Sequence, residues 1–320
     1  MRNAFLKALI ELAKDNPKLM LLTGDLGFGL FEPFIEQFPQ QYLNVGVAEQ
    51  NMMGIATGLS LKGYTVFAYS IANFGTMRCY EQIRNDICYH DANVKIVVSG
   101  GGLSYGALGM SHHATEDIAV MRVLPNMNIL TPCDEWDTYA GTLHFGTLPG
   151  PAYLRLEKGA MPQTRQALDT TFVPGELTYF RKGKDLTIFT YGSIVFEALE
   201  AADRLSQQGI ETEVIHLSSL RPLNHQAILR VLATTSNVIT LEEHSITGGL
   251  GSLVAEIVAD HGVKLKHFTR LGMPNLFSAI VGSQEYLRSY YKMDAKTIEA
   301  TALVHCQNND IKDSFSQGIA

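Results

Sequence analysis

The sequence predicts an α/β fold: two parallel-sheet, three-layer domains in succession. Short apolar, β-rich runs alternate with helical patterns over residues 1–156, which is typical of a parallel sheet covered on both faces. The alternation stops over 157–184 and resumes over 185–310. A chain of 320 residues also suits two domains at about 150 residues each. We therefore expect a first domain at 1–156, a linker at 157–184 and a smaller second domain at 185–310.

The first domain is expected to begin with an amphipathic helix, "MRNAFLKALIELAKDN". Uncharged or nearly uncharged apolar runs predict its strands at 19–24, 65–70, 94–100, 126–132 and 151–156. Helical patterns lie between these strands, at 48–62, 78–89, 115–123 and 134–145.

The expected linker contains prolines and glycines without a clear period, which predicts irregular chain with a small hairpin. In the second domain the strands are predicted at 185–193, 211–219 and 237–243, and the helices at 194–208, 224–233 and 249–260.

Composition narrows the function classes. Hydrophobic residues make up 46% of the chain and the net charge is −7, so a large core is possible and no basic patch favours nucleic acid or an anionic membrane. No apolar run reaches the roughly 20 residues of a membrane span, and the first helix lacks the pattern of a signal peptide. The four cysteines form no C-x-x-C pair, so we expect reduced thiols and a cytoplasmic location.

Polar and aromatic side chains follow several predicted strands. Asp25 follows the first strand, Glu49 opens the helix predicted at 48–62, and Phe74 follows the strand at 65–70. His112 lies in a glycine-rich stretch after the strand at 94–100. Because ligands of open parallel sheets bind beyond the carboxyl ends of the strands, we expect these residues to gather at one sheet edge.

The glycine-rich stretch, "SGGGLSYGALGMSHHATED", matches neither the dinucleotide-binding nor the P-loop pattern and contains no Lys or Arg. We therefore expect this stretch to form a wall of the active site and not a phosphate-binding loop. His112 and His113 are adjacent and cannot easily ligate one ion, so no metal site is expected here. A substrate-facing His112 is one interpretation; a surface or helix-capping histidine is the other.

Several segments resemble the pyrimidine-binding domain of transketolases: "VGVAEQNMMGIATGLSLKGYTVFAYS", "YEQIRNDICYHDANVKIVVSG", "SHHATEDIAVMRVLPNMNILTPCDEWDT" and "PAYLRLEKG". "LSSLRPLN" and "LEEHSITGGLGS" resemble the transketolase C-terminal domain. The resemblance covers about residues 3–300, and the matching segments occur in the same order as in the family. It implies thiamine diphosphate as cofactor and transfer of a two-carbon ketol unit from a ketose donor to an aldehyde acceptor.

The resemblance also implies roles for single residues. Glu49 matches the catalytic Glu that contacts N1′ of the aminopyrimidine, where a carboxyl shielded from water can share a proton. Phe74 matches the aromatic that stacks on that ring, and Ile71 and Met77 stand where the family tends to have further aromatics. Asp25 matches an acid near the cofactor at the subunit boundary. The plainer interpretations are that Glu49 is an acid at a helix start, Phe74 a core residue and Asp25 a turn residue.

Family members carry a Gly-Asp-Gly motif and a later Asn that hold Mg²⁺ and the diphosphate, and this sequence lacks that motif. The resemblance therefore implies a partner chain, the N-terminal half of a split transketolase, and an α2β2 heterotetramer with Mg²⁺ held mainly by the partner.

The substrate-facing residues depart from the pattern of sugar-phosphate transketolases. His112 alone matches the polar residues of the glycine loop, so it is also a catalytic candidate, and Lys158 takes the place of a phosphate-binding Arg. Lys can hold phosphate as a point charge without the bidentate fork. This implies a donor or acceptor other than the ordinary pentose phosphates, such as a modified or nucleotide-linked sugar.

Two other functions remain open. The β subunit of a thiamine-dependent 2-oxo acid dehydrogenase shares the layout and the Glu, and dependence on a lipoyl carrier would distinguish it. A non-catalytic partner that retained the fold is the other, and Glu49 and Phe74 argue against it.

Overall fold

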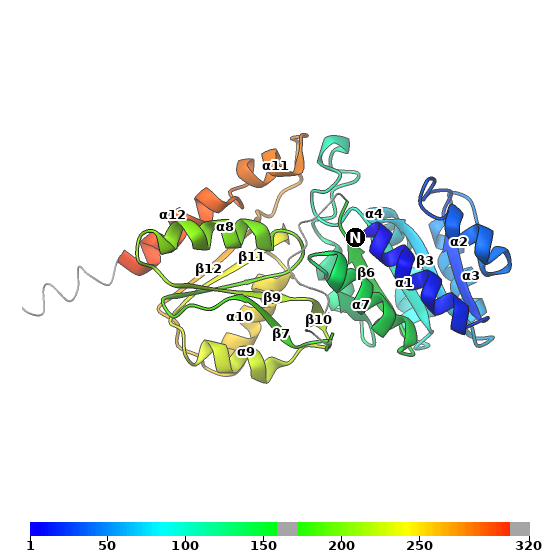
Figure 1. The fold of residues 1–320 in the computed structure, drawn as a ribbon, viewed down its shortest axis with the longest axis horizontal. Coiled ribbons are helices and arrows are strands. Elements are labelled where there is room, and N and C mark those ends of the chain that lie inside the picture. The colour runs from blue at the N-terminus through cyan, green and yellow to red at the C-terminus, as the bar shows by residue number, and fades with distance from the viewer. Residues whose placement is uncertain (159–171, 308–320) are drawn as a thin grey trace, which may run out of the picture.

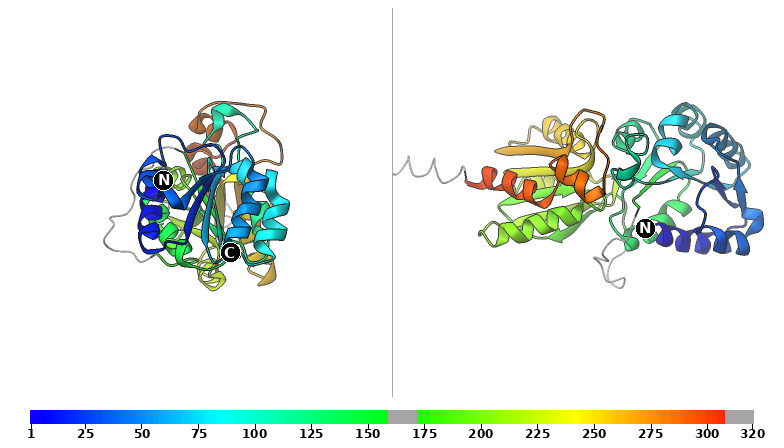
Figure 2. Two further views of the ribbon diagram at one scale, coloured as in Figure 1. Left: turned by 90° about the vertical axis from the view of Figure 1, so that its right-hand side faces the viewer. Right: turned by 90° about the horizontal axis from the view of Figure 1, so that it is seen from above.

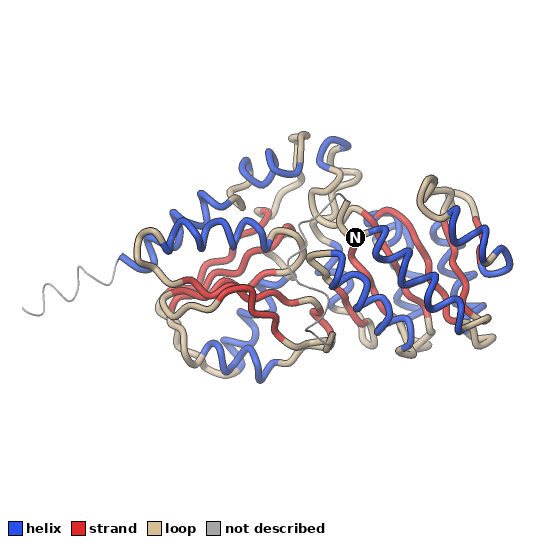
Figure 3. The backbone as a smooth tube through the Cα atoms, viewed as in Figure 1, coloured by secondary structure: helices blue, strands red, loops and turns tan. Residues whose placement is uncertain are grey.

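The computed structural model describes residues 1–158 and 172–307, which form two sheets side by side along the long axis of the molecule (Figure 1). Helices cover both faces of each sheet (Figure 3). Both sheets are mostly parallel. The predicted fold class, two parallel-sheet α/β units, is confirmed. Within the described ranges, no helix combines the length and the apolar character that crossing a membrane requires.

The first sheet has seven strands in the order β10-β5-β6-β4-β3-β1-β2. All neighbours pair in parallel except β10 and β5. The three central strands are buried along nearly their whole length, which explains their apolar sequences. The bounds are β1 Leu19–Thr23, β2 Tyr42–Asn44, β3 Thr65–Ile71, β4 Val94–Ser99, β5 Asn128–Leu130, β6 Ala152–Leu156 and β10 Ser219–Arg221.

The helices predicted at 1–16, 48–62, 115–123 and 134–145 are present. The structure adds short helices that were not predicted, among them Glu32–Gln37 and Ala72–Gly75. The stretch predicted as one helix over 78–89 is a 3₁₀ turn, a short α-helix and a π-helical segment in succession. The bounds are α1 Arg2–Asp15, α2 Glu32–Gln37, η1 Pro39–Gln41, α3 Glu49–Ser60, α4 Ala72–Gly75, η2 Met77–Cys79, α5 Tyr80–Gln82, η3 Ile83–Cys88, η4 Gly106–Leu108, α6 Asp117–Arg122 and α7 Glu135–Thr147.

The second sheet has five strands in the order β12-β11-β8-β9-β7, with β7 antiparallel to β9. Strand β7 lies inside the stretch expected as a linker, 157–184, and residues 159–171 of that stretch lie outside the described residues. The bounds are β7 Leu177–Arg181, β8 Leu186–Thr190, β9 Thr212–Leu217, β11 Asn237–Ser245 and β12 His267–Met273. The helices are α8 Val195–Ser206, α9 His225–Leu232, α10 Leu250–Asp260, α11 Gln284–Tyr290 and α12 Ala295–Gln307.

The two halves share a polar junction. Strand β10 follows β9 of the second sheet in sequence but pairs with β5 of the first, so the chain crosses between the halves. On β6, the buried guanidinium of Arg155 pairs with Asp117 at 2.8 Å and donates to the backbone oxygen of Glu243 at 3.1 Å. The Arg155–Glu243 hydrogen bond therefore joins the two halves. The turned views show the two halves next to each other (Figure 2).

Candidate active site

Glu49 is the first residue of α3 and is only 1% exposed. The Ser70 hydroxyl, at the end of β3, donates to its Oε1 at 3.2 Å. The guanidinium of Arg78 donates to its Oε2 at 2.8 Å. The positive end of the α3 dipole favours a carboxylate at this position, but the burial and the paired cation exceed what a helix-start acid needs.

Aromatic and cationic groups extend from Glu49 in a row. The Arg78 guanidinium carbon lies 4.4 Å from the centre of the Phe74 ring. The Phe74 ring meets the His112 ring edge to face, with centres 5.2 Å apart. Three of the predicted residues and one unpredicted arginine therefore form one continuous row of contacts.

The row continues through the glycine-rich stretch. The His112 ring lies 6.1 Å from that of Tyr105, and the Nζ of Lys158 lies 4.8 Å from the centre of the Tyr105 ring. Lys158 is exposed and follows β6, so it enters from a different strand end. Glu49 and Lys158 thus lie at opposite ends of a row whose members the sequence scatters over more than a hundred residues.

The other predicted residues lie near the Glu49 end. Asp25 is exposed, has a φ of 58°, and its carboxylate accepts from the Asn44 amide at 3.1 Å. Its neighbour Gly24 is close to Glu49, because a Cβ on Gly24 would lie 3.7 Å from the Glu49 Oε1. Ile71 is half-buried next to Ser70, and Met77 is 39% exposed.

The two histidines have different environments. Burial, and then the neighbouring His113, lower the pKa of His112 below its ordinary value. His112 is half-buried and its Nδ1 lies 3.0 Å from the Ser111 hydroxyl. His113 is buried, and its Nε2 donates to the backbone oxygen of Gly106 at 3.1 Å. Of the two, His112 is therefore the one that faces the row.

The residues that sequence reasoning missed are Ser70, Arg78 and Tyr105. Arg78 lies in η2, 29 positions from its partner Glu49, so no local spacing indicates the ion pair. Tyr105 lies inside the glycine-rich stretch, where an aromatic among glycines was the available signal.

Within the described part of the chain, one group of Cys, His and carboxylate atoms is close enough to consider as a metal site. Atoms of Cys133, Asp137 and His216 lie within 4.8 Å of one another, all buried. The backbone N–H of Gly192 donates to the His216 Nε2 at 3.1 Å, so the ring proton is on Nδ1, which faces Asp137 at 3.5 Å. A protonated Nδ1 is not a metal ligand, so we interpret these three residues as part of a buried hydrogen-bond network.

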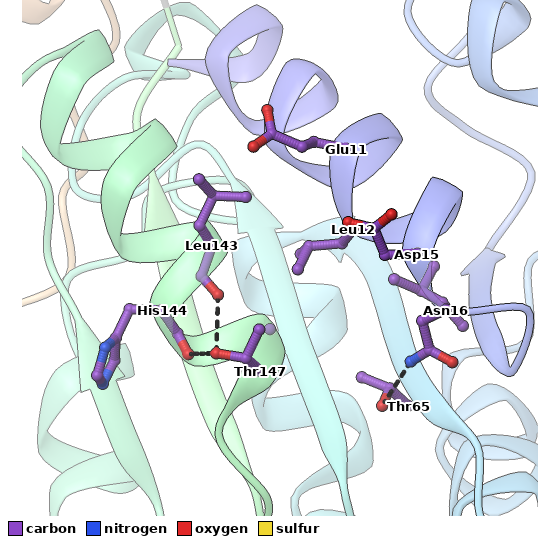
Figure 4. A pocket seen from close by; sticks show the side chains of 10 residues that line it. Glu11, Leu12, Asp15, Asn16, Thr65, Leu143, His144 and Thr147 are labelled. Carbon is purple, nitrogen blue, oxygen red and sulfur yellow. Dashed lines mark hydrogen bonds between the residues drawn. The ribbon is translucent and has the colours of Figure 1, made fainter.

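A cavity of about 650 Å³ lies away from the row, at the amino ends of β1 and β3 (Figure 4). It is lined by α1 and α7 residues including Glu11, Asp15 and His144. None of the predicted site residues lines it. Because ligands of parallel sheets bind at the carboxyl ends of the strands, the row is the better candidate for chemistry.

Comparison with known proteins identifies the two halves. The family "Transketolase, pyrimidine binding domain" matches residues 1–164, and "Transketolase, C-terminal domain" matches residues 175–298. An apulose-4-phosphate transketolase subunit of Actinobacillus succinogenes is 34% identical over 94% of this chain and 96% of its own length. The 6-deoxy-6-sulfo-D-fructose transketolase subunit SqwH of a Clostridium species (strain MSTE9) is 33% identical over 94% of this chain and 93% of its own.

A solved structure described as a split gene transketolase, inactive beta4 tetramer, superposes with a TM-score of 0.87. It is 37% identical and the match covers 96% of this chain and 98% of that one. Sequence and structure therefore agree along nearly the whole chain, and this protein belongs to the transketolase family, as a transferase subunit with the pyrimidine-binding and C-terminal domains.

Proposed function

We propose that this chain is the pyrimidine-binding subunit of a two-component transketolase that transfers a two-carbon ketol unit from a ketose to an aldehyde, with thiamine diphosphate as cofactor. The observation that carries the proposal is Glu49, a carboxylate buried to 1% exposure and linked to the Phe74 ring through Arg78. A shielded acid next to a half-buried aromatic is the arrangement that a protonatable, planar ring requires.

The residues present fit the aminopyrimidine. Arg78 is a planar group that lies over Phe74 and donates to Glu49, so the same space suits a flat ring whose nitrogen shares a proton with the carboxyl group. The Arg78 side chain is 44% exposed and can turn into solvent when that ring enters. When bound, thiamine diphosphate supplies the carbanion chemistry. Glu49 would hold the proton at N1′, Phe74 would pack on the ring, and Ile71 and Met77 would add apolar contact.

We also propose that a partner chain with the diphosphate-binding domain completes the site and holds Mg²⁺. The proposal is supported by the relatives that are named as single transketolase subunits and by the split-gene neighbour. Asp25, exposed beside the Glu49 end of the row, is the acid expected to face the cofactor at the subunit boundary. The split-gene neighbour is described as an inactive beta4 tetramer, so an assembly of that one chain type lacks activity. We propose an active assembly with two copies of this chain and two of the partner.

For the substrate, we propose a modified sugar with an anionic group. The two relatives are named for a sugar phosphate and a sulfo-sugar, and both substrates carry an anion. Lys158 offers one exposed cation at the end of the row opposite Glu49, while His112 lies between them and is placed to contact sugar hydroxyls. A point charge suits either anion, because it does not require the bidentate geometry that Arg prefers.

The proposal is tested by reconstitution. The chain is mixed with a chain from the same genome that carries a Gly-Asp-Gly…Asn motif, thiamine diphosphate and Mg²⁺. Ketol transfer is assayed with hydroxypyruvate, apulose 4-phosphate and 6-deoxy-6-sulfofructose as donors. Formation of a complex with turnover of at least one donor supports the proposal. Binding of cofactor by this chain alone, or activity only with a lipoyl carrier, would overturn it in favour of a one-chain site or a 2-oxo acid dehydrogenase.

A further inference from the structure

The second half of the molecule contacts the glycine-rich wall, which we define as residues 100–115. Glu243, on β11, is 1% exposed and its Oε1 accepts a short hydrogen bond from the backbone N–H of Leu103. The amide of Gln284 donates to both Glu243 carboxylate oxygens, at 2.9 and 3.0 Å, and Arg288 Nε donates to Oε2 at 2.7 Å. One buried carboxylate thus joins the wall to α11.

Two glycines of the wall are explained by its close approach to the second half. Gly102 has a φ of 63°, and a Cβ there would lie 2.6 Å from the Glu243 Oε1. A Cβ on Gly106 would lie 2.5 Å from the backbone oxygen of Gly282. Real Cβ atoms do not come so close to oxygen, so both positions require glycine. The run that matches no phosphate-binding pattern is therefore shaped by the second half of the chain.

The same contacts reach the histidine that faces the row. The Gly282 N–H donates to the Gly106 oxygen at 3.3 Å, and the His113 ring donates to the same oxygen at 3.1 Å. The next residue back, His112, donates its backbone N–H to the Gly109 oxygen at 2.9 Å. Figure 1 shows α11 beside this part of the chain, above the junction of the two sheets. The position of His112 against Phe74 thus depends on a wall that the second half holds.

The Glu243 carboxylate is paired with the guanidinium of Arg288. Arg288 Nη2 lies 2.6 Å from the Glu243 Oε2 and 3.8 Å from the Glu157 Oε2, and it donates to the Ser193 hydroxyl at 2.8 Å. Burial, and then the charge of Glu243, raise the pKa of Glu157. Two buried carboxylates therefore share one guanidinium, and Glu243, which has the shorter contacts to it, also binds the wall.

We propose that Glu243 is a positioning residue: it sets the conformation of the wall and thereby the place of His112 beside the substrate. This inference rests on the proposed ketol transfer for its catalytic consequence. The hydrogen bonds of the carboxylate go to the wall and to α11, and not to Glu49. Its effect should therefore reach the donor sugar and leave cofactor binding unchanged.

The test compares Glu243→Gln with Glu242→Gln. Glu242 precedes it on β11, is fully buried, and accepts from the Leu250 and Gly251 N–H groups, which lie outside the wall. Gln cannot offer oxygens to both Leu103 and Arg288, so one contact is lost in Glu243→Gln. We expect amide hydrogen exchange of peptides within the wall to rise about tenfold in Glu243→Gln, as for a lost buried hydrogen bond, and to stay at the wild-type rate in Glu242→Gln.

In the reconstituted enzyme, Glu243→Gln should raise KM for hydroxypyruvate about fivefold or more, with the cofactor Kd within about twofold. Gln284→Met removes the half-buried amide that donates to Glu243. It should raise both the exchange rate and KM, but by a smaller factor than Glu243→Gln. This variant replaces Glu243→Gln in the test if Glu243→Gln does not fold. Unchanged exchange in the wall, or an equal effect in Glu242→Gln, would overturn the inference. Exchange is measured on this chain, so it decides the positioning role even if no donor turns over and the proposed function fails.

Discussion

Replacement of Glu49 by Gln tests the proton-holding role most directly. The amide has nearly the same shape and keeps one oxygen for Ser70 or Arg78, but it cannot exchange a proton with a ring nitrogen. The fold should survive, because the Arg78 side chain is 44% exposed and a pair with one solvated partner contributes about 0–1 kcal/mol. For a domain of this size that corresponds to a Tm lower by at most about 4 °C.

The expected effect on turnover is much larger. A positioned acid or base contributes about 10²- to 10⁴-fold to the rate, so kcat should fall by that factor. At about 1.36 kcal/mol per tenfold change, the loss is about 3–5 kcal/mol of activation free energy. The assay is steady-state ketol transfer by the reconstituted enzyme at saturating thiamine diphosphate, which separates turnover from cofactor binding.

Ser70→Ala is the matched control. It removes the hydroxyl that donates to the Glu49 Oε1 at 3.2 Å but leaves the carboxylate. The loss of one such hydrogen bond is worth about 0.5–1.5 kcal/mol, so the rate should fall by about tenfold at most. If Glu49→Gln retains more than about a tenth of the wild-type kcat with cofactor bound, Glu49 does not carry the proton and the reasoning from its burial is wrong.

Three further predictions concern the rest of the row and the junction. Lys158→Ala should raise KM about tenfold for a phosphorylated donor and leave KM for hydroxypyruvate unchanged; equal effects on both would exclude an anion contact. Burial lowers the pKa of His112 below its ordinary value of 6.5, so the imidazole is neutral above pH 6.5. Acidification below pH 6.5 should therefore raise KM in the wild type, by protonating His112, but not in His112→Asn, and identical pH profiles would contradict this. Asp117→Asn should lower the free energy of unfolding by about 3–5 kcal/mol in urea, because it leaves Arg155 buried without its partner; a loss below about 1 kcal/mol would show that the ion pair is dispensable.

The fold could be predicted wherever local sequence dictates structure. The strands β3, β4 and β6 are buried on both faces, so their apolar runs stand out from the helices that follow. The three-residue strands β2 and β10 gave no such signal, because their pairing partners are distant in sequence and their burial is partial at Tyr42–Asn44. Strand β7 falls in the stretch expected as a linker for a related reason: its residues are mostly half-buried, at the edge of the second sheet, so they form no apolar run.

The site was predictable to the extent that strand ends define it. The rule that ligands bind at the carboxyl edge selected Glu49, Phe74 and His112 from the sequence, and the structure brings them into one row. Arg78 could not be selected, since its role depends on two side chains from other elements. The glycine-rich wall was recognised, but its cause was not, because Glu243 lies 140 positions away from the Leu103 amide that donates to it.

Arg78 supplies the charge partner of the buried Glu49 carboxylate. A buried charge needs a partner, and Glu49 receives one from the same chain: a planar cation that lies over Phe74. That partner occupies the space proposed for the aminopyrimidine, so the ring and the guanidinium exclude each other. Because the Arg78 side chain is already 44% exposed, its cation loses little when it moves into solvent. The carboxyl group would then share a proton with the ring nitrogen in place of the Arg78 hydrogen bond. The same ion pair that satisfies the Glu49 charge would therefore yield its place to the proposed ring.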